Sequence, residues 1–495
     1  MMEANIPAEK EAPEPHSSEP AQPGSTTDEQ AVPSAQPGST TDEQADQEDN
    51  PQPAPPESES ESRVPSSASS DAGAKGVSQT VVSAMFSSYA FAAFLAAPIF
   101  GRFVGEKGIK YLLIVGGTVA GIACIGFGFL YLLSSTTVFI ALCFTVRVIN
   151  ALGYAAYSTA IFSYLSIKYP THLSTLMGLM AVVIGVGLSL GPAIGGGFFQ
   201  AGGFGPPFYF LGLLLLATTM ITFHLVPEDL NSADTTTMSE ASTSSRRLLP
   251  QILNQTYATF VLIGLFFGSI AFTVFLPTLQ GHLSAIGLAT GTTGELFLLD
   301  MVCIAISGLA VGWTADKIPK YRAQIMAVGF VGLAAAFFIN GPSTNSVWTN
   351  AISLTIHGLM APLVLVPSFS LLHMTAHDDA GLPQNVKTAG AVAGLWNSVL
   401  SLGQTCGPLL SGGPSQYFGF SWTMTVIAIV YLTIGLLYSL FDVAWRHRRG
   451  RHTRGRSGDP EESLSSIIAP LLAKTPVPVA PSPQKSDYGT MSTTT

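Results

Sequence analysis

The chain has 495 residues, of which 47% are hydrophobic and only 11% are charged. A soluble globular chain carries about a quarter charged residues, so this composition argues against a soluble protein and indicates one that spans a membrane. The formal net charge of −9 comes largely from an acidic N-terminal segment and says little about binding partners.

The first 76 residues differ from that average composition. Pro, Ser, Glu, Gln and Ala dominate them, large apolar side chains are scarce, and the unit AQPGSTTDEQA occurs at 21–31 and again at 35–45. Such a segment cannot bury enough apolar surface to offset the entropy lost on ordering it. We therefore expect a disordered acidic tail over 1–76, and nothing in it resembles a cleavable signal peptide.

After this tail, long apolar stretches recur with polar breaks between them. A helix needs about 20 apolar residues to cross the hydrocarbon core of a bilayer. The sequence thus predicts an all-α, multi-pass integral membrane protein with eleven spans, at 77–101, 111–133, 137–164, 173–199, 206–226, 256–280, 293–314, 322–341, 348–373, 387–412 and 420–444.

Lysine and arginine residues indicate the orientation of these spans. They lie in the loops that follow the odd-numbered spans, whereas intervening loops such as 134–137 and 341–347 contain none. Short loops that carry Lys and Arg stay on the cytoplasmic side. The C-terminal tail at 446–495 is therefore predicted to be cytoplasmic, and the basic run at 446–456 with which it begins is interpreted as a membrane-surface anchor.

Two landmarks occur twice in the same order, which indicates an internal duplication. GLSLGPAIGGG at 187–197 matches GQTCGPLLSGG at 403–413, and GRFVGEKGIK at 101–110 matches GWTADKIPKYR at 312–322. A polar cytoplasmic linker separates an N-terminal bundle of five spans from a C-terminal bundle of six, so that the predicted units are 77–226, 227–255 and 256–445. Many transporters consist of two such related halves with the substrate site between them.

The glycine-rich loops, Arg147 with Asn150 and Gly153, and the paired Gly-Pro motifs resemble the major facilitator superfamily, in particular its proton-coupled drug and amine antiporters. The phrases FIALCFTVRVINALGYAA and FLPTLQGHL are most similar to the vesicular polyamine transporter-like branch of the vesicular amine transporter family. The resemblance implies twelve helices in two bundles, with both termini in the cytosol.

Only one predicted span precedes the loop at 101–110, whereas two spans of the second half precede 312–322. The resemblance therefore implies that the family's first helix is missing. Either the chain lacks this helix in nature, or the sequence is an isoform or gene model without it. We favour the second explanation, because the bundle would otherwise lose a wall of its cavity.

Three ionisable residues inside predicted spans are candidates for a role in transport. An arginine at the centre of a lone span costs about 2.5–3.5 kcal/mol on insertion scales, so Arg147 should face the bundle interior or water. The resemblance implies that it serves proton coupling; the alternative is a structural hub that ties helices together. Asp300 either takes up and releases a proton or reaches the membrane interface near Glu295. His357 mirrors Arg147 in the duplication and is either a titrating group or a packing residue.

Neutral polar and aromatic residues on the spans are expected to line or brace the cavity. Asn150, Asn397 and Gln404 offer hydrogen bonds, while Tyr154 and Trp396 offer aromatic faces to a cation or simply pack. Amine transporters of the family carry an acid at the position that Asn397 occupies, so the resemblance supports polyamine selectivity only weakly.

The duplicated motifs have mechanical roles in the family. The Gly-Pro motifs are expected to form a closely packed, bendable seam that limits leak, and they comprise Gly187, Gly191, Pro192, Gly195, Gly196, Gly403, Gly407, Pro408 and Gly412. The loop motifs are expected to form a cytoplasmic gate whose charges latch helix ends, and they comprise Gly101, Glu106, Lys107, Gly108, Gly312, Asp316, Lys317 and Arg322. In the first copy Gly105 stands where the second has Asp316, so that latch should be weak.

No metal-ligand cluster and no Ser/His/Asp arrangement can be placed in the sequence. We therefore expect that the protein is not an enzyme and needs no metal or other cofactor. A proton gradient is expected to drive its activity. The leading hypothesis is a secondary transporter that exchanges protons for small organic cations, polyamine-like or drug-like, in a vesicular, endosomal or plasma membrane. The alternatives are a truncated, non-transporting scaffold or regulator and a carrier of neutral or anionic solutes. The predicted partners are the solute, protons and the bilayer, without nucleic acid, and no oligomer is implied.

Overall fold

The computed structural model describes residues 79–227, 248–275, 290–341 and 346–456, with a few single residues between 275 and 290. The predicted tail at 1–76, most of the predicted linker at 227–255, the last part of the C-terminal tail and the side chain of Pro192 lie outside the described residues.

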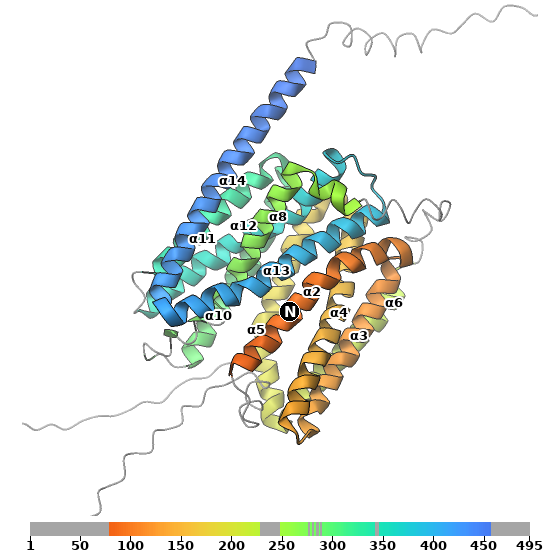
Figure 1. Ribbon diagram of the computed structural model, residues 1–495, viewed down its shortest axis with the longest axis vertical. Coiled ribbons are helices and arrows are strands. Elements are labelled where there is room, and N and C mark those ends of the chain that lie inside the picture. Colours follow the sequence, from red (N-terminus) through yellow and green to blue (C-terminus); the bar gives the residue numbers. More distant parts are fainter. Residues whose placement is uncertain are drawn as a thin grey trace, which may run out of the picture. The chain divides into compact units, whose positions relative to one another are not determined.

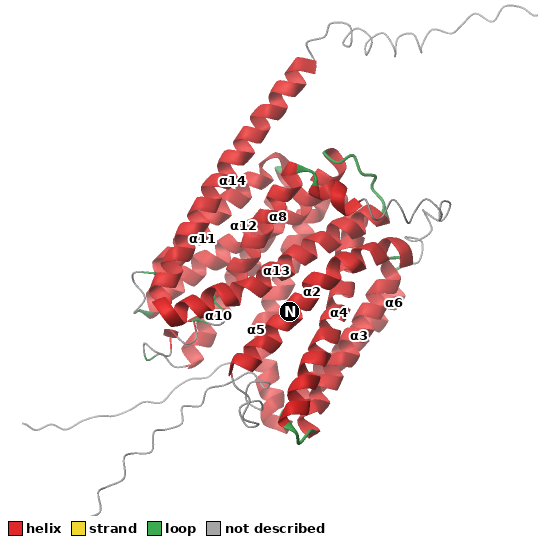
Figure 2. Cartoon of the chain, in the orientation of Figure 1, coloured by secondary structure: helices red, strands yellow, loops and turns green. Residues whose placement is uncertain are grey.

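The described residues fold into long helices without strands (Figures 1 and 2). Each predicted span overlaps one described helix, and most helices run past the predicted ends because the prediction counted only the apolar part. In the span predicted at 256–280 the helix ends at Val274, and part of 276–280 lies outside the described residues. The helices are α2 (Gln79–Lys107), α3 (Ile109–Phe129), α4 (Thr136–Lys168), α5 (Leu173–Gly202), α6 (Gly205–Leu225), α8 (Thr256–Val274), α10 (Thr290–Lys317), α11 (Arg322–Asn340), α12 (Val347–Asp378), α13 (Val386–Phe418) and α14 (Phe420–Arg456).

Local sequence explains several of the helix ends. Gly108, Gly203 and Gly419 adopt φ angles of 88°, 78° and 82°, a conformation that only glycine adopts without strain. They separate α2 from α3, α5 from α6, and α13 from α14. At the start of α13 the Asn385 side chain accepts a hydrogen bond from the Thr388 N–H (2.9 Å), as N-cap residues do. These short connections keep consecutive helices antiparallel.

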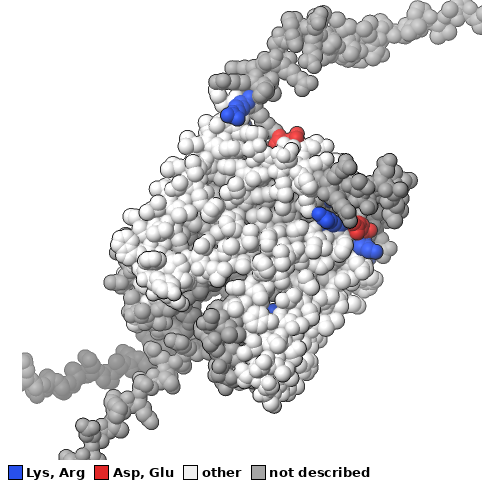
Figure 3. Space-filling model, in the orientation of Figure 1, with Lys and Arg blue, Asp and Glu red and all other residues white. Residues whose placement is uncertain are grey.

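Ten of the helices in the described part of the chain are long and apolar enough to cross a membrane, and α13 is the exception. Its 33 residues are rich in Gly, Ser and Thr, and it packs against α2, α4 and α8. Asn397 and Ser401 are buried there, so these two polar side chains contact protein instead of lipid. On the face shown in Figure 3, charged side chains gather toward one end and most of the surface is uncharged.

The helices form two bundles with matching internal contacts. In the first, α3 packs against α4 and α6, and α2 against α4; in the second, α11 packs against α12 and α14, and α10 against α12. The pairs α2–α13 and α5–α10 join the two bundles. This arrangement confirms the predicted fold of two related helical bundles.

Helix α8 has no counterpart among the described helices of the first bundle. It packs against α13 and α12, which correspond to α5 and α4 in the duplication. No described helix packs against α5 and α4 in the same way.

Candidate transport site and gate

The second loop motif joins the two bundles through Asp316, which lies near the end of α10. Its Oδ1 accepts a hydrogen bond from the Ser174 N–H (3.1 Å), and its Oδ2 accepts one from the Thr175 N–H (2.7 Å). These amides belong to the first turn of α5, where free N–H groups and the helix dipole favour a negative charge. Asp316 therefore caps a helix of the other bundle, and its role as a latch stays a prediction.

Arg322 holds this carboxylate in place. Its Nη2 lies 3.0 Å from Asp316 Oδ1, and its Nε donates to the Ala315 carbonyl at 3.0 Å. Both side chains are about nine-tenths buried, with exposed fractions of 10% and 8%. Lys317, by contrast, is exposed and places its Nζ 3.7 Å from the centre of the Trp313 ring. We refer to Asp316, Arg322 and the first turn of α5 as the α10–α5 latch.

The first loop motif makes a close backbone contact, and no charged latch like that of Asp316 is found for it among the described residues. A Cβ on Gly101 would lie 2.5 Å from the Gly390 carbonyl oxygen, so α2 and α13 approach backbone to backbone. At Gly105 a Cβ would meet the Lys387 side chain at 2.8 Å, and α13 is capped by its own Asn385 instead. Glu106 and Lys107 are exposed, and Gly108 forms the turn. The weakness of this copy stays a prediction.

Just inside the latch, side chains from both bundles fill the space between them. Ser174 Oγ of α5 lies 2.8 Å from Ser370 Oγ of α12, and the Asn397 Nδ2 of α13 donates to Ser158 Oγ of α4 at 2.7 Å. The ring of Phe162 of α4 lies 4.9 Å from that of Trp396, in an edge-to-face arrangement. The bundles are thus closed against each other at the end where α2, α4 and α10 finish, which we call the lysine-bearing end.

Trp396 and Asn397 have defined roles in this closed interface. The Trp396 indole donates to Ser368 Oγ at 2.9 Å and packs against Phe369 as well as Phe162, so in this conformation it is a packing residue. The Asn397 side chain is buried, and its Oδ1 has no hydrogen-bond partner among the described residues.

Asp300 and His357, which the sequence presents as separate candidates, form a buried pair inside the second bundle. His357 Nδ1 of α12 lies 2.9 Å from Asp300 Oδ1 of α10, and the side chains are only 2% and 4% exposed. The alternative that Asp300 reaches the membrane interface is wrong. Because α10 begins at Thr290, ten residues earlier, Asp300 lies about 15 Å along the helix.

The neighbours of His357 fix the proton count of the pair. His357 Nε2 lies 3.2 Å from the Ala271 carbonyl oxygen of α8, and a carbonyl oxygen only accepts, so Nε2 must carry a hydrogen. The Nδ1–Oδ1 contact then requires one further proton, on either the imidazole or the carboxyl group. In both cases the pair has a net charge of zero. Removing the shared proton would leave a net charge of −1 in a buried position.

Gly358 of α12 leaves room for the side chain of Asp300 beside His357. A Cβ on Gly358 would lie 2.9 Å from Asp300 Oδ1 and 2.5 Å from the Asp300 carbonyl oxygen. Only glycine therefore allows α12 to approach α10 this closely beside His357.

Arg147 lies in the first bundle and does not join the Asp300–His357 pair. Its guanidinium carbon is 4.9 Å from the centre of the Phe127 ring of α3, while Asn150 one turn later donates to the Ala120 carbonyl at 3.0 Å. Tyr154 packs against Tyr89 of α2 with ring centres 5.8 Å apart. These contacts hold α4 against α3 and α2, and a role in proton coupling stays a prediction.

The two halves differ at the position that Asp300 occupies in the second half. Tyr89 and Asp300 each lie twelve residues before the first glycine of their loop motif. The first bundle thus has a tyrosine where the second has a carboxyl group, and only the second can hold the shared proton described above.

The two Gly-Pro motifs have different surroundings. In α13, a Cβ on Gly403 would lie 2.6 Å from the Phe266 carbonyl oxygen of α8, and one on Gly407 would overlap Thr273. In α5, which continues as an unbroken helix through Gly191, a Cβ on Gly187, Gly191, Gly195 or Gly196 would meet no described atom within 4 Å. Gly412 is equally open. The expected close packing is therefore found on α13, where α8 provides the partner.

Several residues that form contacts in this region were not predicted from the sequence. Ser174, Thr175, Ser158 and Ser370 provide cross-bundle contacts, and Gly178 meets Gly308 where α5 crosses α10. Single serines in apolar spans give no signal of their own. The pair Gly390 and Gly394, four residues apart on α13, resembles a helix-packing motif and could have indicated the contact with α2. Gln404 is half-buried on α13.

Comparison with known proteins supports this architecture. The family model of the Major Facilitator Superfamily matches residues 64–382. The chain is 30% identical to the MFS-type transporter SLC18B1 of Mus musculus over 402 residues, which are 79% of this chain and 85% of the relative. It is also 30% identical to SLC18B1 of Homo sapiens over 400 residues, covering 80% and 85%. The Multidrug resistance protein MdtG of Dickeya zeae is 23% identical, with 72% and 82% covered.

Two solved structures show the same fold at low sequence identity. The human organic anion transporter MFSD10 (TETRAN) superposes with a TM-score of 0.59 at 18% identity, covering 75% of this chain and 88% of that chain. The proton:xylose symporter XylE superposes with a TM-score of 0.59 at 14% identity, covering 76% and 90%.

Proposed function

Since the chain belongs to the major facilitator superfamily and is a multi-pass membrane transporter, not an enzyme, we propose that it exchanges protons for small organic cations. The Asp300–His357 pair carries the exchanged proton.

The proton count of the pair supports this proposal. With its shared proton the pair is neutral, and without it a charge of −1 remains in a site whose side chains are at most 4% exposed. A buried, unpaired charge is strongly unfavourable. The deprotonated state therefore needs either a return of the proton or a positive charge nearby. A cationic substrate supplies that charge, so binding of the cation and loss of the proton favour each other, which is the requirement for antiport.

The interface between the bundles supports alternating access. The latch and the α2–α13 contact close the lysine-bearing end through groups from both bundles. Rocking of one bundle against the other separates these groups without unfolding either bundle. Phe162, Phe369 and Trp396 then become available to an organic cation, which aromatic faces attract.

The direction of transport follows from the orientation of the chain. By the positive-inside rule the lysine-bearing end and the C-terminus are cytoplasmic, so the closed end in this structure faces the cytosol. Exchange of cytosolic cations for protons then requires an acidic compartment on the other side, such as the lumen of a vesicle or endosome, or the outside of the cell.

The test uses purified protein in liposomes with an acidic interior. The proposal predicts that a polyamine or a small aromatic amine accumulates inside only while the pH gradient lasts, and that a proton-exchanging ionophore abolishes this accumulation. Uptake of a neutral sugar or a carboxylate from the same panel, with none of the amines, would support a carrier of neutral or anionic solutes instead. A folded protein that moves no member of the panel would favour the scaffold or regulator.

A further inference from the structure

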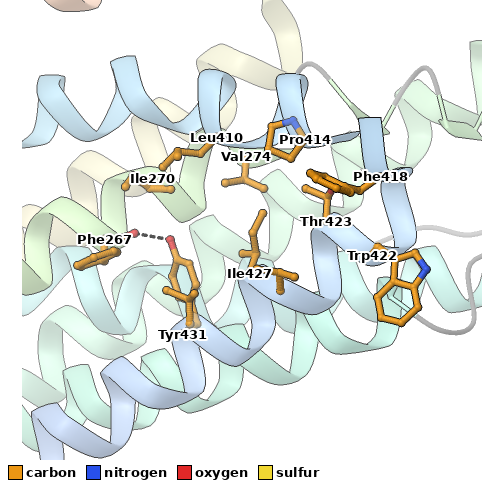
Figure 4. A pocket seen from close by; sticks show the side chains of 12 residues that line it. Phe267, Ile270, Val274, Leu410, Pro414, Phe418, Trp422, Thr423, Ile427 and Tyr431 are labelled. Carbon is orange, nitrogen blue, oxygen red and sulfur yellow. Dashed lines mark hydrogen bonds between the residues drawn. The ribbon is translucent and has the colours of Figure 1, made fainter. Parts of the chain in front are cut away.

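Helices α8, α13 and α14 enclose a cavity of about 680 Å³ on the side away from the lysine-bearing end (Figure 4). Its floor consists of buried side chains, among them Ile270, Val274 and Tyr431. Its rim consists of exposed apolar side chains on α13 and α14, namely Leu410, Phe418, Trp422, Val426 and Val430.

The described residues that line the cavity offer no free polar group that would orient a polar ligand. Tyr431 donates its hydroxyl hydrogen to the Phe267 carbonyl at 2.5 Å, a bond drawn in Figure 4, and Thr423 donates to the Gly419 carbonyl at 2.9 Å. None of the lining side chains is charged. An organic cation of the proposed substrate class would lose its hydration here without gaining a partner, whereas a hydrocarbon chain would lose nothing.

The rim opens onto the surface that faces the bilayer. Val426 and Val430 belong to a row of exposed apolar residues that continues along α14 through Leu437 and Leu440. From Trp422 near the start of α14 to Tyr431 the cavity follows nine residues of the helix, or about 13 Å. This is roughly the depth of one leaflet, since the whole hydrocarbon core is about 30 Å thick. Tryptophan at the mouth is typical of the membrane interface.

We propose that this cavity is a lipid site that holds one acyl chain of a bilayer phospholipid. The chain enters past Trp422 and lies against Ile270 and Val274, filling the space where α14 diverges from α8. Because only the acyl chain of the lipid lies inside the cavity, the site selects lipids by the shape of this chain and not by their headgroup. The proposal is independent of the proton-coupled function.

The experiment uses the full chain in nanodiscs that contain phosphatidylcholine with a photoreactive diazirine near the end of one acyl chain. After illumination, mass spectrometry locates the adducts. We expect adducts on the peptides that contain Ile270 and Val274. In Val426→Trp, which obstructs the mouth from an exposed position, these adducts should fall at least fivefold. Ile429→Trp, an exposed position on the same helix outside the cavity lining, is the matched control and should behave like the parent.

Two further arms make the outcome decisive. Phosphatidylglycerol with the same chain should give the same adducts, and Leu410→Trp should repeat the effect of Val426→Trp from the other side of the mouth. The absence of floor adducts in the parent, or equal adducts in both rim variants and the parent, would overturn the proposal. Displacement of the adducts by a transported amine would assign the cavity to the transport path and would also overturn it.

Discussion

The carboxylate of Asp316 accepts a 2.7 Å hydrogen bond from the backbone N–H of Thr175, although the two residues belong to different bundles. One charged side chain at the end of α10 thus provides the N-terminal cap of α5. If the bundles rock apart as proposed, this contact breaks, so we expect it to stabilise the closed conformation.

Removal of this latch should open the lysine-bearing end. Hydrogen bonds to charged groups contribute about 1.5–3 kcal/mol each, and 1.4 kcal/mol changes an equilibrium tenfold. In a background without the four native cysteines, Asp316→Ala should raise the rate at which Cys in place of Ser370 reacts with N-ethylmaleimide by at least about tenfold. Asp316→Asn, which keeps one acceptor oxygen, should give a smaller increase. Equal rates in the three proteins would show that Asp316 does not hold this end closed.

The backbone contact between α2 and α13 should be equally sensitive to one methyl group. Since a Cβ on Gly101 would lie 2.5 Å from the Gly390 carbonyl oxygen, Gly101→Ala forces the helices apart and should reduce substrate uptake at least about tenfold. The bundle itself should remain folded. A Cβ on Gly126 of α3 would meet no described heavy atom within 4 Å, so Gly126→Ala is the control. Normal uptake by Gly101→Ala would contradict the close approach.

Two matched glycines in the Gly-Pro motifs should respond differently to alanine. Gly403→Ala meets the Phe266 carbonyl oxygen at 2.6 Å and should lower the Tm, because overpacking costs about 1–3 kcal/mol. Gly187 is its counterpart in the duplication and faces no described atom within 4 Å. Gly187→Ala should leave the Tm unchanged or raise it slightly, since alanine favours helix. A matching loss of Tm in Gly187→Ala would show that another helix packs against α5.

The Asn397–Ser158 hydrogen bond should appear as coupling between the bundles. A bond between neutral groups contributes about 0.5–1.5 kcal/mol net. Ser158→Ala and Asn397→Leu should each destabilise the closed state, and the double variant should do so by less than the sum of the two. Reactivity of the cysteine in place of Ser370 measures this equilibrium in all four proteins. Additive effects would mean that the 2.7 Å contact contributes nothing to closure.

Helix number, bundle order and the duplication were predictable from the sequence, because length and apolarity define a span in a membrane and repeated motifs define the halves. Even α13, with many polar residues, was predicted as a span at 387–412 from its apolar stretch. The resemblance of the loop motif to a family gate indicated that Asp316 contacts a helix end, but not that this helix belongs to the other bundle.

The pairing of Asp300 with His357 could not be predicted in the same way. The two residues are 57 positions apart, and neither the spacing nor the duplication aligns them, because the first half has Tyr89 in place of the acid. Their contact depends on the rotation of α10 and α12 about their axes and on the small size of Gly358. The open surroundings of Gly187 and Gly191 could not be predicted either, because the Gly-Pro motif has a similar sequence in both halves.

Proton movement coupled to exchange tests the central claim most directly. Proteoliposomes that contain a pH-sensitive dye and an acidic interior should lose protons when a transported amine is added outside. Asp300→Asn keeps the size of the side chain but cannot give up a proton. Because this variant stays in the neutral state that does not favour the cation, we expect weaker amine exchange and no change of internal pH on amine addition. Proton efflux from Asp300→Asn at the parental rate would contradict the assignment of the coupled proton to the Asp300–His357 pair.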